Sequence, residues 1–319
     1  MSPESRPNIP AGYTVRHPTR DDLPAIAAMT AAADLHDTGA IDFTPATFDL
    51  EWASARFDPA QDAWLVETSD GQAAAYMALS RRPNIPPEGA GWIHPDHRGR
   101  GIGTLVFDLA EARVHEIIDT SDEHIPRVAV QWSNHAQREF GRFLETRGYA
   151  VTRSFWRMST MLGDEEPAAP EWPAGIEVRT MRPGVDDLAV HTTVTTAFRD
   201  HWGSSPLPFE EWRVARMGLR FFDPELWLLA WSGDQIVGAA LNTDEDGEAW
   251  VSTLGVLREA RGKGLGRALL IESFRTFHRR GQRHVMLGVD AENLTGATRL
   301  YEGAGMVVDR QYDHWERSL

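Results

Sequence analysis

Two glycine-rich turns carry the clearest chemical signal in this sequence. They are Arg98-Gly99-Arg100-Gly101-Ile102-Gly103 and Arg261-Gly262-Lys263-Gly264-Leu265-Gly266, and an amphipathic segment follows each. Glycines directly before a helix let successive backbone N–H groups converge on an anion, and the helix dipole adds to the attraction. A diphosphate is the natural ligand of such a turn. The alternative is a tight strand-to-helix turn that binds nothing.

Two other phosphate-binding motifs fit these turns less well. A dinucleotide fingerprint needs a glycine at its sixth position, where Thr104 and Arg267 stand instead. A Walker loop needs Gly-Lys followed by Ser or Thr, but Lys263 is followed by Gly264. The turns therefore predict a phosphate site of a different kind.

The chain repeats itself at an offset of about 163 residues, which is the signature of a duplication. Besides the glycine turns, the matching segments are Gly12–Arg16 with Gly175–Arg179, Phe57–Pro59 with Phe222–Pro224, and Trp64–Val66 with Trp227–Leu229. Residues 162–175 between the copies contain three prolines, two glycines and several acids. This composition is typical of a semi-rigid exposed linker. We place the boundary near residue 168, between an N-terminal domain at 1–165 and a C-terminal domain at 172–319.

Each copy shows the same order of expected elements. A short strand and a helix beginning at Asp21 or Asp186 are followed by an irregular helical region and a hairpin. The predicted hairpins are 63–67 with 73–79 and 227–231 with 236–242. A strand, exemplified by 249–256, then leads through the glycine turn into a long helix, and a last strand and helix follow. This mixture predicts an α/β domain whose sheet is mostly antiparallel with a parallel portion.

Composition limits the classes of function. The net charge of −15 disfavours nucleic acid and anionic membranes as partners and favours small cationic ligands. The chain has no cysteine, which excludes disulfides and a thiol nucleophile and fits a cytoplasmic location. Neither a signal peptide nor a membrane span is expected, and no residue spacing predicts a metal site. A monomer and a homodimer are both compatible with the sequence.

With these turns, the sequence resembles the GNAT superfamily of N-acetyltransferases. The family's coenzyme A signature, Arg/Gln-x-x-Gly-x-Gly/Ala, matches both turns. Leu254-Gly255-Val256 before the second turn, and Asn293 followed by Leu300-Tyr301 and Gly305-Met306, match the rest of the family's frame. The resemblance covers nearly the whole chain as a tandem pair, as in double-domain members from actinobacteria. It implies two GNAT-like domains and acetyl-CoA as co-substrate.

The resemblance also implies which residues bind the coenzyme. Leu254, Gly255 and Val256 would pair with the pantetheine arm through their backbone and would offer N–H groups to the thioester carbonyl. The diphosphate would lie on Arg261, Gly262, Lys263, Gly264, Leu265, Gly266 and Arg267, with Asn293 nearby. The first-copy equivalents are Arg98, Gly99, Arg100, Gly101, Ile102 and Gly103.

Tyr301 is the expected general acid, because a phenol can donate a proton to the leaving thiolate. The alternative role of Tyr301 is structural, as a tyrosine packed against the sheet. Counting back from Gly148-Tyr149 as from Gly305-Met306 puts Leu144 at the Tyr301 position of the first copy. Leucine donates no proton. We therefore expect the first domain to be catalytically degenerate.

The general base is less defined by the sequence. Many members of the family have a glutamate four residues before the Val256 position, where this chain has Ser252. Serine can order a water molecule, and His201 has a pKa suited to a base. The other candidates are carboxylates, namely Glu248, Asp246, Asp244, Asp200, Glu210 and Glu211. Trp202, Phe209 and Trp212 are candidate walls of an acceptor pocket, and core packing is expected for at least one of them.

The sequence thus predicts an enzyme that transfers an acetyl group from acetyl-CoA to a primary amine of a small molecule, with the chemistry in the C-terminal domain. The transfer would proceed by direct attack of the amine. Two alternatives remain at this point. One is acetylation of a cysteinyl amino sugar, and the other is a non-catalytic sensor that binds acyl-CoA.

Overall fold

The computed structural model describes residues 8–43, 48, 51–54, 56–121, 124–245, 247–293 and 296–319. The chain divides into two compact units. Unit 1 comprises Met1–Thr152 and Asp313–Leu319, and unit 2 comprises Arg153–Tyr312. In the part of the chain that the structure describes, no helix is long and apolar enough to cross a membrane.

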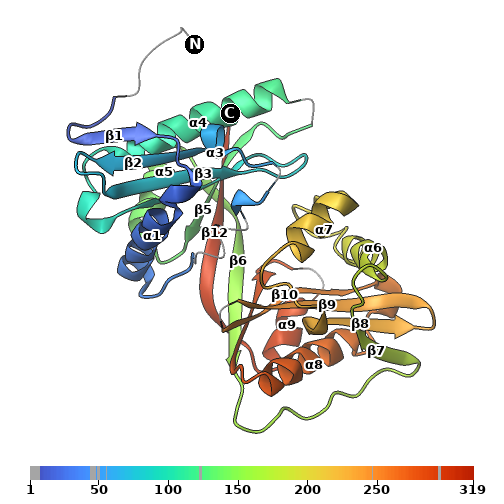
Figure 1. The fold of residues 1–319 in the computed structure, drawn as a ribbon. Helices are drawn as coiled ribbons and strands as arrows, with labels where there is room; N and C mark the ends of the chain where they lie inside the picture. Colours follow the sequence, from blue (N-terminus) through green and yellow to red (C-terminus); the bar gives the residue numbers. More distant parts are fainter. Residues whose placement is uncertain are drawn as a thin grey trace. The chain divides into compact units, whose positions relative to one another are not determined.

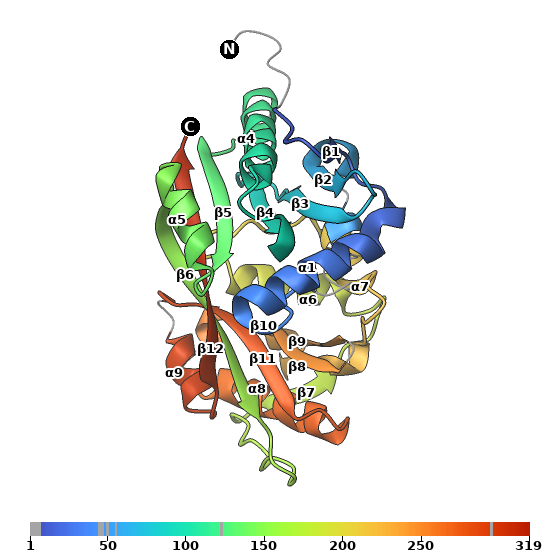
Figure 2. The same cartoon turned by 90° about the vertical axis from the view of Figure 1, so that its left-hand side faces the viewer.

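In unit 1, a sheet lies between α1 on one face and α4 and α5 on the other (Figures 1 and 2). Its strand order is β1-β2-β3-β4-β5-β12, where β12 is Val307–Ser318. Strands β4 and β5 are parallel, whereas β1 to β4 pair antiparallel. The elements are β1 (Tyr13–Arg16), α1 (Leu23–Thr38), α3 (Pro59–Asp62), β2 (Ala63–Thr68), β3 (Ala73–Ser80), β4 (Glu88–Ile93), α4 (Ile102–Thr120), β5 (Val128–Asn134) and α5 (Arg138–Thr146).

Unit 2 repeats this arrangement, with α6 and α7 on one face of its sheet and α8 and α9 on the other (Figure 1). The strand order is β6-β11-β10-β9-β8-β7, in which only β10 and β11 are parallel. The elements are β6 (Ala150–Met161), β7 (Ile176–Thr180), α6 (Asp187–Ala197), α7 (Phe209–Met217), β8 (Trp227–Ser232), β9 (Gln235–Glu245), β10 (Glu248–Val256), α8 (Leu265–Arg279), β11 (His284–Asp290), α9 (Ala297–Glu302) and β12 (Val307–Ser318). The predicted fold class and both hairpins are confirmed.

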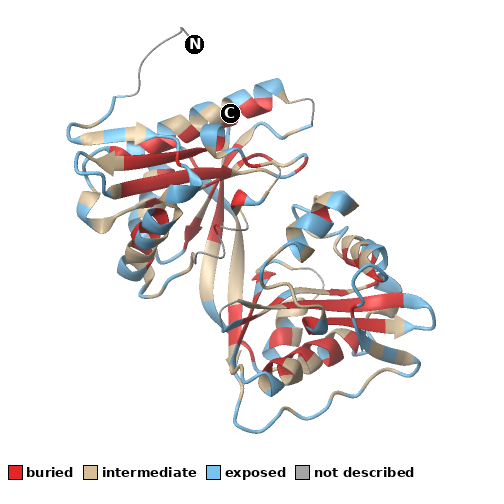
Figure 3. Ribbon diagram, viewed as in Figure 1, coloured by how far each residue is buried: buried red, intermediate tan, exposed pale blue. Residues whose placement is uncertain are grey.

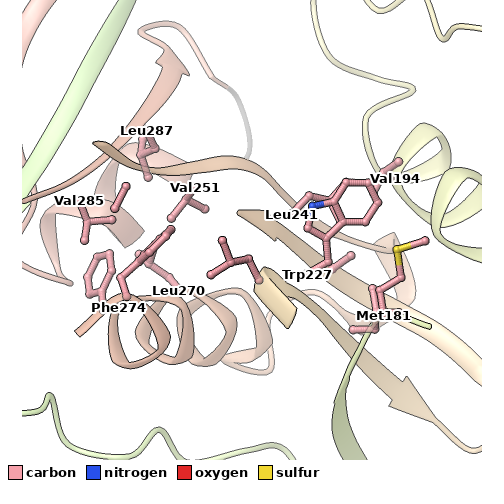
Figure 4. Close-up of a cluster of buried hydrophobic side chains, with 14 of the residues drawn as sticks. Met181, Val194, Trp227, Leu241, Val251, Leu270, Phe274, Val285 and Leu287 are labelled. Carbon is pink, nitrogen blue, oxygen red and sulfur yellow. The ribbon is translucent and has the colours of Figure 1, made fainter. Parts of the chain in front are cut away.

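The long helix of each unit packs its apolar stripe on the central strands, which are the most buried elements (Figure 3). In unit 2, Leu270 and Phe274 of α8 lie against Val251, Val285 and Leu287 of β10 and β11 (Figure 4). Residues spaced by three and four positions fall on one helical face, which explains why this stripe becomes core. The packing holds β10 and the start of α8 in a fixed relation on either side of the glycine turn.

The last strand of each sequence copy extends into the unit of the other copy. Most of β6 lies in unit 2, where Phe155–Met161 pair with Asp290–His284 of β11. The end of β12 lies in unit 1 beside β5, where Leu319 N–H donates to the Arg127 carbonyl. The compact units therefore differ from the predicted domains at 1–165 and 172–319, because each sheet is completed by a strand from the other copy.

The linker at residues 162–175 lies on α8 of unit 2. Arg275 and Arg279 both pair with Glu166, at 2.7 and 2.9 Å, and His278 Nε2 lies 3.0 Å from the Asp164 carbonyl. Trp172 packs against the apolar cluster that contains Val256 and Leu265. The basic end of α8 is therefore occupied by the linker, and this connection is ordered against the unit.

The exchange of strands predicts that a residue near the C-terminus stabilises the unit built from the N-terminal half. Trp315 of β12 is only 6% exposed in the core of unit 1, and its indole Nε1 donates to Ser133 Oγ at 2.9 Å. Trp315→Ala should lower the free energy of unfolding by about 3–5 kcal/mol, because it opens a cavity in that core.

Hydrogen exchange should show the loss of protection in β5 and α4, with β11 and α8 unaffected. Val307→Ala is the matched control, since Val307 is 64% exposed at the other end of the same strand. Loss of protection in unit 2 alone would contradict the strand exchange.

Candidate active site

The site is built on a gap between two parallel strands. β10 pairs with β11 only at Ala249–Val285 and Trp250–Met286, although both strands continue for several residues. On its other side β10 stays paired with β9 as far as Val256. The strands therefore separate like the arms of a V, and the backbone of residues 251–256 faces the opening.

The pairing with β9 fixes which backbone groups point into this gap. Leu257 N–H donates to the Val237 carbonyl on the β9 side. Since backbone groups alternate along a strand, Gly255 also bonds toward β9, and the N–H groups of Leu254 and Val256 point toward the gap. These two groups stand where the resemblance places the pantetheine and the thioester carbonyl.

Ser252 forms a β-bulge directly before this edge. Val251 is opposite Asn242 and Thr253 is opposite Leu241, so Ser252 is the extra residue. A bulge bends the strand and redirects the groups that follow it. In unit 1 the pairing of β3 with β4 is regular from Ala75–Ile93 to Ser80–Glu88. The two units therefore differ in shape at this position.

The glycine turn presents a row of free amides. Gly262 and Gly264 have positive φ values of +74° and +83°, and a Cβ at either would meet open space. Among the described residues, none accepts a hydrogen bond from the N–H groups of 262–267, and the helix ladder begins with Ala268 N–H to the Gly264 carbonyl. Such a row of amides at the start of a 15-residue helix fits a diphosphate.

The first-copy turn keeps the same backbone. Gly99 and Gly101 have φ values of +70° and +83°, and the ladder begins with Leu105 N–H to the Gly101 carbonyl. A Cβ at Gly101 would lie 3.6 Å from Pro10. Unit 1 therefore retains the backbone conformation of the turn, and its differences from unit 2 lie elsewhere.

The arginines that begin the two turns act as ties within the fold. Arg261 donates to the carbonyls of Val256, at 3.0 Å, and Ala197, at 2.9 Å, which joins the end of β10 to the end of α6. Arg98 likewise donates to the carbonyl of Ile93, at 3.4 Å, and it also forms a bidentate pair with Asp37 of α1, at 2.6 and 3.0 Å. Both side chains hold the turn in place through hydrogen bonds within the fold. Lys263 and Arg267 are exposed beside the free amides.

Close packing explains the two remaining predicted glycines. A Cβ at Gly255 would lie 3.1 Å from the Phe198 ring and 3.2 Å from Ala197, so the bare backbone lets α6 approach β10. A Cβ at Gly266 would lie 3.2 Å from Leu300. The second contact places α9, and with it Tyr301, against the first turn of α8.

Tyr301 lies in the core of unit 2 and is 8% exposed. Burial raises its pKa to about 12, so the phenol carries its proton throughout the physiological range. In the part of the chain that the structure describes, the hydroxyl has no hydrogen-bond partner. The group is therefore a protonated donor with free capacity, as a general acid requires.

The backbone identifies Leu144 as the counterpart of Tyr301. The Leu144 carbonyl accepts from the N–H groups of Arg147 and Tyr149, and the Tyr301 carbonyl accepts from those of Ala304 and Met306. Leu144 is fully buried. Unit 1 thus has a hydrocarbon side chain where unit 2 has a phenol.

His201 lies in the turn after α6, with its ring centroid 4.4 Å from that of Phe198. Burial, together with the positive charge of Arg261, lowers the pKa of His201 below its usual value, although Asp290 and Asp200 oppose the shift. The imidazole is consequently neutral at pH 7 and can accept a proton. It is the predicted base that lies close to the gap.

Three of the predicted carboxylate bases lie away from the gap or are engaged. Glu248 begins β10 and is four residues before Ser252, which is about 13 Å along a strand. Asp244 accepts from Gly247 N–H and from Gln282, so it shapes the hairpin turn. Glu210 pairs with Arg213 on the exposed side of α7. Asp246 lies outside the described residues, and Ser252 Oγ is 3.0 Å from Thr243 Oγ1.

The predicted aromatic walls separate into core and surface. Trp212 is buried in the core of unit 2, and Phe209 packs beside it. Trp202 is 41% exposed and contacts Phe155 of β6, with ring centroids 5.8 Å apart. Only Trp202 therefore presents its ring at the surface near His201.

The sequence analysis missed a group of residues on the exchanged strand. Arg153 of β6 pairs with Asp290 at 2.7 Å, and its guanidinium lies 5.2 Å from the Trp202 ring. Asp290 is the last residue of β11. Asn293 lies in the turn that follows, and its backbone N–H donates to the Asp290 carbonyl. No local pattern could reveal this cluster, because it depends on which copy supplies the strand.

Comparisons with known proteins show the family of this chain. The model of the acetyltransferase (GNAT) family matches residues 30–142 and 189–306. A mycothiol acetyltransferase from Kineococcus radiotolerans is 34% identical over 257 residues, which cover 78% of this chain and 80% of that protein. A mycothiol acetyltransferase from Streptomyces scabiei is 30% identical over 295 residues, 91% of each chain.

Solved structures show the same tandem architecture. A GCN5-related N-acetyltransferase from Sphaerobacter thermophilus has 36% sequence identity and a TM-score of 0.81, covering 97% of this chain and 96% of that one. A tandem GNAT protein from the clavulanic acid biosynthesis pathway shares the fold, with a TM-score of 0.72 at 16% identity, covering 96% of this chain and 98% of that one.

The environment of His201 makes a direct prediction about its titration. Its imidazole should titrate below the ordinary value of about 6.5, because burial and Arg261 disfavour the charged form. Histidine NMR, with His201→Gln to assign the resonance, measures this value. In denaturant the pKa measured from the same resonance should return to about 6.5. A native value at or above 6.5 would contradict the described surroundings.

Proposed function

Because the chain belongs to the GNAT acetyltransferase family, we propose that unit 2 transfers an acetyl group from acetyl-CoA to a primary amine of a small molecule. The observation that carries this proposal is the gap between β10 and β11, which leads directly to the free amides of the glycine turn. A long donor with a diphosphate at one end and a thioester at the other matches this layout.

The residues present fit acetyl-CoA at each point of contact. The amides of 262–267 would bind the diphosphate, and Lys263 and Arg267 would add positive charge. The N–H groups of Leu254 and Val256 would bind the pantetheine arm and polarise the thioester carbonyl, as an added strand does. Arg261 would keep the end of β10 open by holding the Val256 carbonyl.

The chemistry would be a direct transfer. The amine nitrogen attacks the carbonyl carbon, the carbon–sulfur bond breaks, and the sulfur receives a proton from Tyr301. His201, directly or through water held by Ser252, receives the proton that the amine loses. The buried phenol, with a pKa of about 12, would keep its proton until the thiolate forms.

The acceptor has a second candidate. The relatives at 30–34% identity are named mycothiol acetyltransferases, which favours the cysteinyl amino sugar acetylated by mycothiol synthase as a substrate of this chain too. This chain has Ser252 where many members of the family have a glutamate, so the proton of the amine would need another acceptor. Both candidates share a primary amine on a small polar body.

Release of CoA from acetyl-CoA, followed with a thiol reagent, tests the proposal. The absence of cysteine from the chain removes any protein background from this assay. Ethanolamine, glucosamine, spermidine and tyramine form a first panel, and the cysteinyl amino sugar is followed by product mass. Binding of CoA without release by any amine would replace the enzyme with an acyl-CoA sensor.

Removal of the Tyr301 hydroxyl should slow the transfer. Tyr301→Phe should lower kcat at least tenfold, about 1.4 kcal/mol of barrier, because no other donor replaces the phenol. The affinity for CoA, measured by calorimetry, should stay within twofold. Leu144→Tyr offers the reverse change in unit 1 as a control, and an unchanged kcat in Tyr301→Phe would remove Tyr301 from the mechanism.

Matched substitutions in the two glycine turns should separate the units. Gly264→Val forces a β-branched residue to adopt a φ of +83° and should disrupt the amide row, which weakens CoA binding at least tenfold. Gly101→Val imposes the same strain in unit 1, also at +83°, and should leave the turnover of the full chain within twofold. Equal loss of turnover in both variants would place chemistry in both units.

A further inference from the structure

Gly288, in the middle of β11, has no reason in the fold to be a glycine. Gly288 does not have a positive φ, it is exposed, and a Cβ added to it would have no atom within 4 Å. Among the described glycines only Gly163, in the linker, shares these properties. Glycine within a strand costs conformational entropy, and it often marks a place where another molecule approaches the backbone.

Gly288 borders the gap between β10 and β11, in register with the bulge at Ser252. Met286 is the last residue of β11 paired with β10, and it is opposite Trp250. Gly288 is two residues further and thus level with Ser252. Leu287 points into the core with α8 (Figure 4), so Gly288 faces the opposite side of the sheet. This is the side on which Phe198 covers Gly255.

The rim around Gly288 is polar. Ser252 and Thr243 form a hydroxyl pair on the β10 side. On the β6 side Gly288 is opposite Arg157, whose side chain therefore shares its face and pairs with Asp309 at 2.9 and 3.1 Å. The open floor is thus bordered by hydroxyl groups, an ion pair and bare backbone.

Unit 1 fills the same position with a large side chain. β5 and β11 both bury the second, third, fourth and sixth of their seven residues. The turns that follow them are closed by Gln137 N–H to the Asn134 carbonyl and by Asn293 N–H to the Asp290 carbonyl. This equivalence matches Gly288 with Trp132. The Trp132 indole donates to Glu88 at 3.2 Å and lies edge-on to His314, with centroids 4.8 Å apart.

We propose that Gly288 is the specificity-determining residue of unit 2, and that the body of a small polar amine lies on its bare backbone with the amino group beside Ser252 and the gap. The inference rests on the proposed function. A nucleophile placed there is at the height of the thioester edge, next to Leu254. Trp132 covers the corresponding floor in unit 1, so the two units differ in acceptor binding as well as in the acid.

A series of substitutions in the full chain tests this acceptor site on the backbone of Gly288, which is called the seat below. Gly288→Trp should reproduce the unit 1 arrangement and lower kcat/KM for the amine at least tenfold, with CoA affinity within twofold and an unchanged melting temperature. Gly288→Ala should fold normally and raise the KM for the amine less than Gly288→Trp does. Gly163→Trp is the control, because Gly163 has the same open surroundings in the linker. An unchanged kcat/KM in Gly288→Trp overturns the proposal.

A second measurement does not depend on activity. The chain has no cysteine, so Gly288→Cys and Gly163→Cys each introduce one thiol, whose alkylation by N-ethylmaleimide is followed by mass. Each amine of the panel is added with CoA present. An amine that uses the seat should slow alkylation of Gly288→Cys at least threefold and leave Gly163→Cys unaffected.

The two measurements separate this inference from the proposed function. Slowed alkylation without any CoA release in the wild type would defeat the proposed function and retain the seat. An amine that is acetylated without slowing alkylation, or a panel in which no amine slows it, would overturn the seat.

Discussion

The separation of β10 from β11 is the constraint on which the site depends. Two parallel strands that paired along their whole length would satisfy every backbone amide that points from one strand toward the other. Here the pairing ends at Trp250, and the bulge at Ser252 turns the rest of β10 toward α6. Arg261 secures this position by binding the Val256 and Ala197 carbonyls, and Gly255 lets α6 come close. The free edge is therefore a product of packing, and several elements maintain it.

The two units show how a duplicated site diverges while its scaffold is kept. The glycine turns have nearly the same backbone, and the glycine that caps the following helix, Gly101 or Gly264, has a φ of +83° in both. The differences are concentrated where chemistry or an acceptor would be. Leucine replaces the phenol, a regular strand replaces the bulge, and an indole covers the floor that is bare in unit 2.

Local patterns made part of this structure predictable from the sequence. The repeat, the hairpins, the stripe of Leu270 and Phe274, and the relation of Leu144 to Tyr301 all depend on short-range spacing. Other features depend on contacts between distant residues. The exchange of β6 and β12, the pairing of Arg98 with Asp37 and the docking of the linker through Glu166 leave no local pattern. For Gly288 a signal was present, a glycine inside a strand, but its meaning required the surrounding space to be seen.

The exchanged strands have a consequence for the history of the chain. The first copy supplies β6 to the sheet that carries Tyr301, and Met158 of that strand is fully buried in its core. Deleting the first copy would leave β11 as an unprotected sheet edge, which is a known route to aggregation. Selection can therefore relax on the chemical groups of unit 1 without permitting its loss. Loss of the first copy would therefore also remove a strand that the sheet of the second unit uses.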